Sequence, residues 1–135
     1  MKYFTINELC ASETATKYNI RNIPNEEQRQ NLISLVENVL DPLRELLGAP
    51  IYVNSGFRSK ELNKKVSGVS NSQHLTGSAA DVHCYDNYTL YKLLKNSDLP
   101  FDQLILEKGT TTHPKWLHIS WSKTPRKQIL FYNSL

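Results

Sequence analysis

Three side chains that could bind a metal stand at two places in the sequence. His74 and Asp81 lie seven positions apart, and His118 follows much later in the chain. Two imidazole nitrogens and one carboxylate oxygen make a three-ligand zinc site whose fourth tetrahedral position is open to water. Zinc lowers the pKa of such a water and makes it a nucleophile at neutral pH. The pattern therefore predicts a catalytic zinc site and a zinc hydrolase.

The segments around these residues predict a loop and two strands. His74 falls in a loop over 67–78, which is rich in Gly, Ser and Asn, and Asp81 falls near the start of a strand over 79–85. Another strand is predicted over 116–121. Side chains alternate along a strand, so one face of this segment carries Trp116, His118 and Ser120, and the core face carries Leu117, Ile119 and Trp121. Neighbouring strands would bring the ligands together on one face of a sheet.

The remaining patterns predict helices followed by strands. Asn25 is a helix cap, and the apolar residues after it follow helical spacing until Gly48, with Pro42 kinking the helix or starting a second one. Shorter elements are predicted as a strand over 51–54, a helix over 59–66, a helix capped by Asn87 and running to Leu94, and strands over 101–107 and 128–132. Strands that cluster after helices indicate an α+β fold, an antiparallel sheet with helices packed on one side.

Length and composition predict one ordinary globular domain over residues 1–135. Charged residues make up 21% of the chain and hydrophobic residues 39%, which argues against disorder. The net charge of +3 is spread along the chain, and no Lys/Arg run is dense enough to indicate nucleic acid. A positive protein would still be attracted to an anionic polymer such as a cell wall.

The apolar runs are too short for a membrane span, and the first residues lack the apolar core of a signal peptide. Cys10 and Cys84 do not form a disulfide framework. We expect two buried thiols, although the sequence leaves a single bridge open. We also expect a monomer.

Four motifs, taken in order, resemble one family. They are Ser55-Gly56-Phe57-Arg58-Ser59, Ser72-x-His74-x-x-Gly77-x-Ala79-Ala80-Asp81, Phe101-Asp102-Gln103-Leu104-Ile105-x-Glu107 and Trp116-x-His118-x-Ser120. Together they resemble the zinc D-Ala-D-Ala carboxypeptidases and murein endopeptidases, a family that shares its fold with the hedgehog signalling domain and includes phage endolysins. Residues 4–10 and 22–24 also resemble small members, so the resemblance spans nearly the whole chain.

The resemblance implies a hedgehog/DD-peptidase-like fold, a peptidoglycan peptide as substrate, and one zinc ion per chain. The ligands it implies are His74, Asp81 and His118. It further implies that Arg58 binds the carboxylate of the substrate and that Ser72 forms a hydrogen bond near the same group. A guanidinium pairs with a carboxylate through two parallel hydrogen bonds, and a D-Ala-D-Ala terminus presents such a group.

At the position where the general base is expected, this chain differs from the better-known members of the family. Many relatives have an acidic residue three positions before the last zinc histidine, and here that residue is Lys115. A lysine acts as a base only where burial strongly lowers its pKa. Two substitutes resemble residues of other members: Glu107 resembles a glutamate of the small ones, and His113 a catalytic histidine of some carboxypeptidases. We predict that Glu107 transfers the proton and that His113 stabilises the transition state.

Each of these residues also has a purely structural interpretation. A lone histidine such as His118 is more often a hydrogen-bonded structural residue, and an arginine such as Arg58 often forms a surface ion pair. Ser72 could simply turn its loop, Glu107 could be a solvated carboxylate at a strand end, and His113 could be an ordinary exposed residue. The joint occurrence of the motifs favours the functional interpretation of the three ligands, but leaves both interpretations of Ser72 and His113 open.

Three functions follow from the sequence. The first is a peptidase that cuts a D-Ala-D-Ala terminus or an L-Ala-D-Glu bond of peptidoglycan. The second, suggested by Lys115, is a zinc-containing binding or structural module without hydrolytic activity, and the third is an enzyme with another substrate. The presence of Arg58 beside the three ligands favours the first. A chain without a signal peptide would remain cytoplasmic until its release to the cell wall, or would be phage-encoded.

Overall fold

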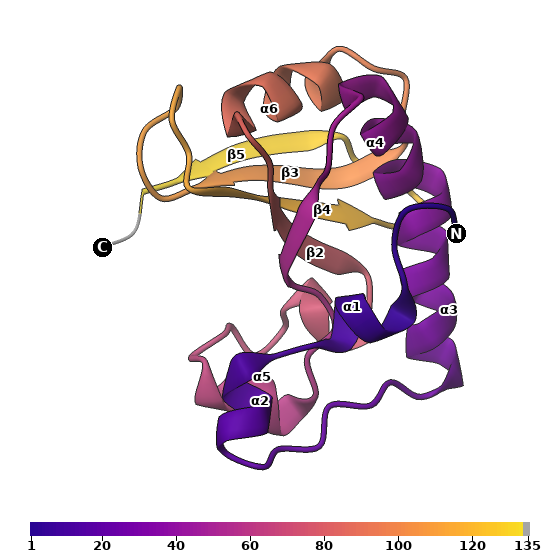
Figure 1. Cartoon of the computed structure of the whole chain (residues 1–135), viewed down its shortest axis with the longest axis vertical. Coiled ribbons are helices and arrows are strands. Elements are labelled where there is room, and N and C mark those ends of the chain that lie inside the picture. Colours follow the sequence, from indigo (N-terminus) through magenta and orange to yellow (C-terminus); the bar gives the residue numbers. More distant parts are fainter. Residues whose placement is uncertain (134–135) are drawn as a thin grey trace.

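A five-stranded sheet in the order β1-β2-β4-β3-β5 forms the centre of the fold (Figure 1). The computed structural model describes residues 1–133. The strands are β1 (Tyr52–Ser55), β2 (Ala79–His83), β3 (Phe101–Glu107), β4 (Trp116–Trp121) and β5 (Gln128–Tyr132). The bounds of β3, β4 and β5 coincide with those predicted from the sequence.

The sheet is mixed, which corrects the purely antiparallel sheet expected from the sequence. β1 with β2, β2 with β4 and β3 with β4 are antiparallel, but β5 runs parallel to β3. Both edges of β4 are already paired, with β2 and with β3. The chain leaving β4 therefore crosses to the free outer edge of β3, and after this reversal it runs in the direction of β3. The prediction of an α+β fold with a sheet and helices is otherwise confirmed.

The crossover between β4 and β5 is attached to the start of β3. The carboxylate of Asp102 accepts hydrogen bonds from Nε and Nη2 of Arg126 at 2.9 and 2.8 Å, and from its backbone N–H at 3.0 Å. The backbone N–H of Lys127 donates to the carbonyl of Phe101. These bonds fix the place where β5 begins.

One long helical segment lies beside the sheet. It consists of α3 (Glu26–Leu35), the π-helical turn η1 (Val36–Leu40) and α4 (Asp41–Leu47), and ends at Gly48 in the left-handed conformation. Asn25 caps α3 as predicted, by accepting a hydrogen bond from the backbone of Gln28. Pro42 is the second residue after the π turn. A proline clashes with the carbonyl four residues earlier in a regular helix, and a wider turn relieves this clash, so the helix continues through the proline.

The shorter helices are α1 (Ile6–Cys10), α2 (Glu13–Lys17), α5 (Lys60–Lys65), the 3-10 turn η2 (Gln73–Thr76) and α6 (Asn87–Lys95). Neither α1 nor α2 was predicted, because a helix of five residues contains too few apolar positions to show a period. The cap predicted for α6 is wrong by one residue. Asp86 accepts from the backbone of Tyr88, whereas the side chain of Asn87 donates to the carbonyls of Pro114 and Lys115.

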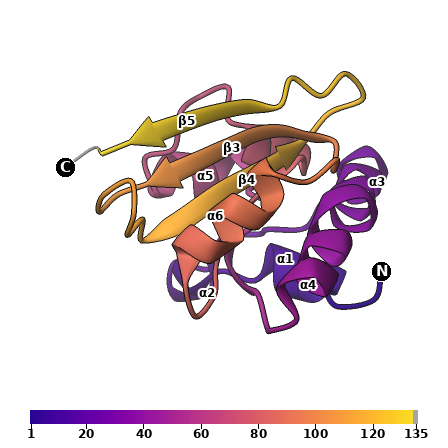
Figure 2. The same ribbon diagram turned by 90° about the horizontal axis from the view of Figure 1, so that it is seen from above.

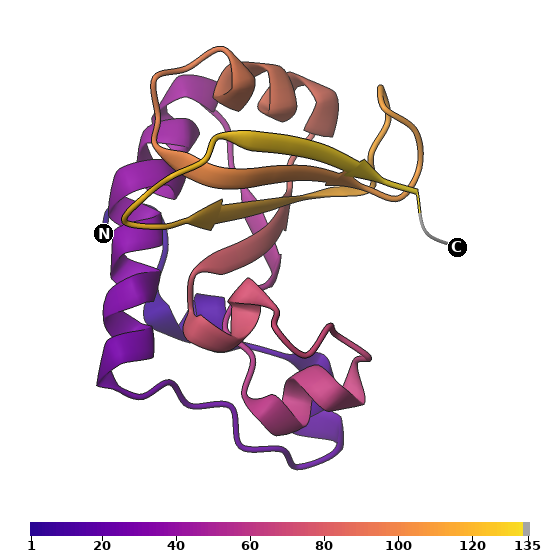
Figure 3. The ribbon, with the colours of Figure 1, turned by 180° about the vertical axis from the view of Figure 1, so that it is seen from behind.

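The helices and the strands enclose one hydrophobic core. Figure 2 shows α6 crossing β3 and β4, with α4 and α1 on the same side, and α6 contacts both strands. Buried apolar residues of α3, η1 and α4 pack against those of β2, β3 and β4. Figure 3 shows the sheet from behind, where the segment that carries α5 and η2 lies next to β2. The candidate ligands come from this region.

Two smaller expectations concern the cysteines and the membrane. Cys10 and Cys84 are free and half-buried, so the alternative of a bridge between them is not realised. Within residues 1–133, no helix has the length and apolar character needed to cross a membrane.

Candidate metal centre

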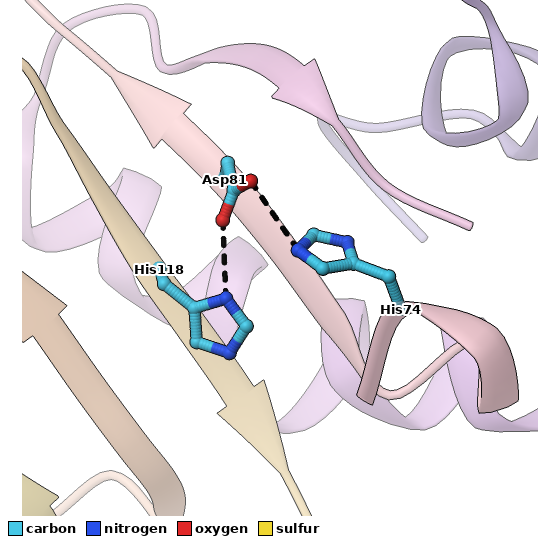
Figure 4. A group of neighbouring side chains, drawn as sticks. All are labelled: His74, Asp81 and His118. Carbon is cyan, nitrogen blue, oxygen red and sulfur yellow. Dashed lines mark hydrogen bonds and ion pairs between the residues drawn. The ribbon is translucent and has the colours of Figure 1, made fainter. Parts of the chain in front are cut away.

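The three predicted ligands converge at one point (Figure 4). His74 comes from η2, Asp81 from β2 and His118 from β4. Asp81 and His118 are direct partners in the pairing of β2 with β4, so their side chains leave the same face of the sheet. The Asp81 carboxylate lies between the two rings, with Oδ2 3.3 Å from Nε2 of His74 and Oδ1 3.1 Å from Nδ1 of His118.

A hydrogen bond from Nδ1 fixes the orientation of the His74 ring. Its Nδ1 lies 2.6 Å from the carbonyl oxygen of Gly56, so Nδ1 carries the proton and donates it. Nε2 then carries a lone pair, is buried, and has no hydrogen-bond partner among residues 1–133. A buried polar atom without a partner is rare and costly. Here it points toward Asp81, which is where a metal ion would satisfy it.

Gly56 can lie against α1 only because it has no side chain. A Cβ at this position would lie 2.1 Å from the carbonyl oxygen of Leu9 in α1. The backbone N–H of the next residue, Phe57, donates to the same carbonyl. The first helix thus fixes the Gly56 carbonyl that orients the ring of His74.

The charge of Asp81 is stabilised by its neighbours. Burial by itself would raise its pKa, but the positive charge that His74 and His118 carry when protonated outweighs burial and holds the pKa well below its ordinary range. A bound metal ion would supply the positive charge in place of these protons. Arg58 adds a third contact, since its Nη2 lies 3.4 Å from Oδ2 of Asp81. The aspartate is therefore ionised, as a metal ligand must be.

The donor set fits a zinc ion. Three ligand atoms, two nitrogens and one carboxylate oxygen, lie within 4.8 Å of one another. Tetrahedral zinc with bonds of about 2.0–2.1 Å has its ligand atoms roughly 3.3 Å apart. Oδ2 of Asp81 lies 3.3 Å from Nε2 of His74, and Oδ1 lies 3.1 Å from Nδ1 of His118, so each ring has a carboxylate oxygen at about this distance. Among residues 1–133 this is the single cluster of three or more His, Cys, Asp or Glu side chains with such spacing.

The cluster lies in a cleft of about 670 Å³ that is also lined by Arg58, Ser72 and Glu107. This volume falls in the usual range for a site that binds a small molecule or a peptide segment. Glu107 ends β3 opposite Trp116 of β4, whose indole Nε1–H donates to its Oε2. Burial, and then the negative charge of Asp81, raise the pKa of Glu107. A carboxyl group with a raised pKa beside a metal site is suited to accept and return a proton.

Of the other residues considered from the sequence, Ser72 lines the cleft, whereas His113 and Lys115 do not. Ser72 caps η2 by accepting a hydrogen bond from the backbone N–H of His74, and its role toward substrate stays a prediction. His113 is exposed in the loop between β3 and β4, where Nδ1 contacts the hydroxyl of Thr112, and it is not among the residues that line the cleft. It therefore has no part in the mechanism proposed below. Lys115 is exposed too and does not line the cleft.

The sequence analysis assigned no role to Ser55, Asn63 and Gln73, which contact the predicted site residues Arg58 and His118. Arg58 donates from Nε to the hydroxyl of Ser55 at 3.0 Å and from Nη1 to the amide oxygen of Asn63 at 3.2 Å. Gln73 contacts His118. Ser55 stands three positions before Arg58 in one of the motifs, but the motif does not reveal that the two side chains form a hydrogen bond. The contact of Gln73 joins segments far apart in sequence and leaves no local signal.

Comparison with known proteins agrees with this geometry. The family model described as Peptidase M15 matches residues 2–120. A zinc D-Ala-D-Ala carboxypeptidase from Streptomyces albus G is 50% identical to the chain over 44 residues, which cover 32% of this chain and 17% of that protein. The match thus spans about a sixth of the length of the curated relative. The family expected from the motifs is confirmed: the chain belongs to the M15 peptidase family.

Proposed function

We propose that this protein is a zinc peptidase that hydrolyses the stem peptides of peptidoglycan. The observation that carries the proposal is the unsatisfied, buried Nε2 of His74, which faces an ionised aspartate and a second histidine inside a cleft. The family and the partial similarity to a zinc D-Ala-D-Ala carboxypeptidase support both the metal and the substrate class.

His74, Asp81 and His118 would hold the zinc ion through Nε2, a carboxylate oxygen and Nδ1. When bound, the ion supplies Lewis acidity and a water of lowered pKa. Three protein ligands distinguish a catalytic zinc site from a structural site with four. Among residues 1–133, no further His, Cys, Asp or Glu belongs to the cluster.

Glu107 acts as the general base. Its Oε2 accepts the indole N–H of Trp116, and this contact fixes the orientation of the carboxylate. Oε1 is left to take a proton from the attacking water and to return it to the amine that leaves. Its raised pKa brings the carboxyl closer to neutral pH, where a base and an acid are needed in the same cycle.

Arg58 binds a carboxylate of the substrate. A guanidinium has five N–H groups, and three are used by Ser55, Asn63 and Asp81. Within the part of the chain that the structure describes, one N–H remains on Nη1 and one on Nη2. This is the pair that makes a bidentate contact with a carboxylate, a group present both at a D-Ala-D-Ala terminus and within stem peptides.

The position of Glu107 also bears on the alternative of a zinc module without activity. That alternative was suggested by Lys115, which stands where many relatives have an acidic residue. Lys115 is exposed, and a half-buried carboxylate from β3, that of Glu107, lines the cleft with the ligands instead. The proton-transfer group of this chain is thus supplied from a neighbouring strand, which favours hydrolysis.

The test is incubation of the zinc-loaded chain with defined muropeptides, followed by mass spectrometry. Release of D-Ala would identify a carboxypeptidase, and cleavage between L-Ala and D-Glu would identify an endopeptidase. Glu107→Gln is the matched control, because it keeps the shape of the side chain and removes the base. If zinc-loaded wild type left all muropeptides intact, the proposed activity would be refuted.

A further inference from the structure

The second ring nitrogen of His118 faces the side-chain amide of Gln73, a residue that takes no part in the mechanism proposed so far. Nδ1 of His118 lies beside Asp81, while Nε2 lies 3.4 Å from Oε1 of Gln73. The Nε2 amide of Gln73 in turn donates to Oδ2 of Asp102 at 2.9 Å. A line of polar groups thus leads from the metal site to a buried carboxylate at the start of β3.

The carboxylate of Asp102 determines which group donates and which accepts in each of these hydrogen bonds. An ionised carboxylate can only accept hydrogen bonds, so Asp102 requires the NH₂ group of Gln73 to face it. The amide oxygen of Gln73 must then face His118, where it can only accept. His118 satisfies this oxygen with a proton on Nε2, which leaves the lone pair on Nδ1, the nitrogen that lies beside Asp81.

Asp102 is held firmly enough to impose this direction. It lies where the pairing of β3 with β4 shifts register between Phe101 and Leu104. A bulge re-aims a side chain, and here Asp102 is buried although its neighbour Phe101 is buried as well. Arg126 donates to both oxygens of Asp102 and is the first cause of its low pKa of about 2, so the group is ionised at neutral pH.

A purely structural role does not account for Gln73. The bonds between Arg126 and Asp102 already attach the crossover to β3. Within residues 1–133, the side chain of Gln73 forms no hydrogen bond to that crossover, and its amide oxygen faces His118. Metal-bound histidines generally donate their other N–H to a carboxylate, a carbonyl or water, and that contact sets the tautomer of the ring.

We propose that Gln73 and Asp102 are positioning residues that fix the orientation and tautomer of His118, so that its Nδ1 is presented to the metal. This inference rests on the proposed function, because it assumes a zinc ion at His74, Asp81 and His118. It assigns the amide of Gln73 the part that a carbonyl usually plays. Asp102 acts one step further away, by fixing which end of the amide faces the ring.

The test measures zinc affinity and the His118 ring protons in the full chain. Gln73→Met keeps the length of the side chain but removes the acceptor, and leaves the Arg126–Asp102 pair in place. We expect zinc to bind roughly 10- to 100-fold more weakly, the usual effect of losing such a partner. Gln128→Met on β5 is the matched control, since it removes an exposed amide contact with Gln103 of β3. It should leave zinc affinity within about twofold of wild type.

NMR of ¹⁵N-labelled wild type loaded with zinc supplies a readout that does not depend on any variant folding. We expect the His118 proton on Nε2, in slow exchange with water, and in Gln73→Met we expect this proton to exchange rapidly. Zinc bound to Nε2 of His118, or an unchanged affinity in Gln73→Met, would overturn the inference while leaving the peptidase proposal intact. A wild type that binds no zinc at all would overturn both.

Discussion

Arg58 donates a hydrogen bond to Asp81, the carboxylate that lies between the two histidines of the site. The same guanidinium holds Ser55 and Asn63, and it keeps one free N–H on each Nη atom. A single side chain thus orients a metal ligand and faces the cleft in which the substrate would lie. This double role explains why an arginine, with its planar set of donors, stands here.

Arg58→Lys should therefore impair substrate binding more than metal binding. A lysine offers one point charge and cannot make these contacts together. We expect kcat/KM for stem peptides to fall roughly 10- to 100-fold, mainly through KM, with a smaller loss of zinc affinity. Arg44→Lys is the control, because Arg44 packs on Tyr3 in another part of the molecule. An unchanged KM in Arg58→Lys would exclude the carboxylate clamp.

Glu107→Gln should remove turnover and leave zinc bound. The variant loses the group that accepts the proton, a loss of roughly 100- to 10,000-fold in kcat. Gln keeps the size of the side chain and an oxygen for the Trp116 N–H. Steady-state kinetics and metal analysis of the same preparation check both parts. Near-normal kcat at full zinc occupancy would assign the proton transfer to another group.

Trp116→Phe should shift the pH profile in a defined direction. Burial raises the pKa of Glu107 above its ordinary value of 4.5, and the Trp116 hydrogen bond counteracts part of this rise. A base must be deprotonated, so activity is lost as pH falls through its pKa. Without the indole N–H the pKa rises further, and the acid limb of kcat/KM moves to higher pH. Trp121→Phe is the control, because Trp121 lies at the other end of the same strand and forms no hydrogen bond with Glu107; it should leave the acid limb of kcat/KM unchanged. A shift of this limb to lower pH in Trp116→Phe would contradict the proposed effect of Trp116 on Glu107.

Gly77→Ala should destabilise the protein more than Gly48→Ala. Both glycines have positive φ, 76° and 68°, so both substitutions share the backbone cost of roughly 1–2 kcal/mol. A Cβ at Gly77 would also lie 2.4 Å from the carbonyl oxygen of Gln28 in α3, whereas nothing lies within 4 Å of one at Gly48. Urea unfolding of the metal-free variants gives the difference. Equal losses would show that the close approach of η2 to α3 is not a constraint.

Asp102 should contribute acid-sensitive stability. Its pKa is about 2 in the folded protein, mainly because of Arg126, and 3.8 is its ordinary value. A carboxyl with a lowered pKa stabilises the fold above its unfolded pKa, and this contribution is lost as pH falls from about 4 to 2. Linkage gives a loss of roughly 2 kcal/mol. Unfolding curves at pH 5, 4, 3 and 2 should show this loss in wild type but not in Asp102→Asn. If the free energy of unfolding fell equally with pH in both proteins, the contribution assigned to Asp102 would be contradicted.

The strands and the ligands could be predicted from sequence because their signals are local. The alternation in Trp116–Trp121 placed His118 on the face opposite Leu117 and Ile119, which are buried in the core. The register that sets Asp81 against His118 follows once β2 and β4 are neighbours. The family motifs supplied the rest of the site.

Other features depend on contacts between distant segments and could not be predicted. The direction of β5 is set by which strand edge remains free, a property of the whole sheet. The bulge that buries Asp102 breaks the alternation on which a strand prediction relies. The carbonyl of Gly56 orients His74 through a backbone atom, which every residue type possesses.

Zinc titration of the metal-free chain tests the site most directly, with His74→Ala, Asp81→Asn and His118→Ala measured alongside. We predict about one zinc ion per wild-type chain, and at least 100-fold weaker binding in every variant while the fold is retained. A folded wild type that takes up no zinc, or zinc binding that is unaffected by all three substitutions, would contradict the metal centre on which the function depends.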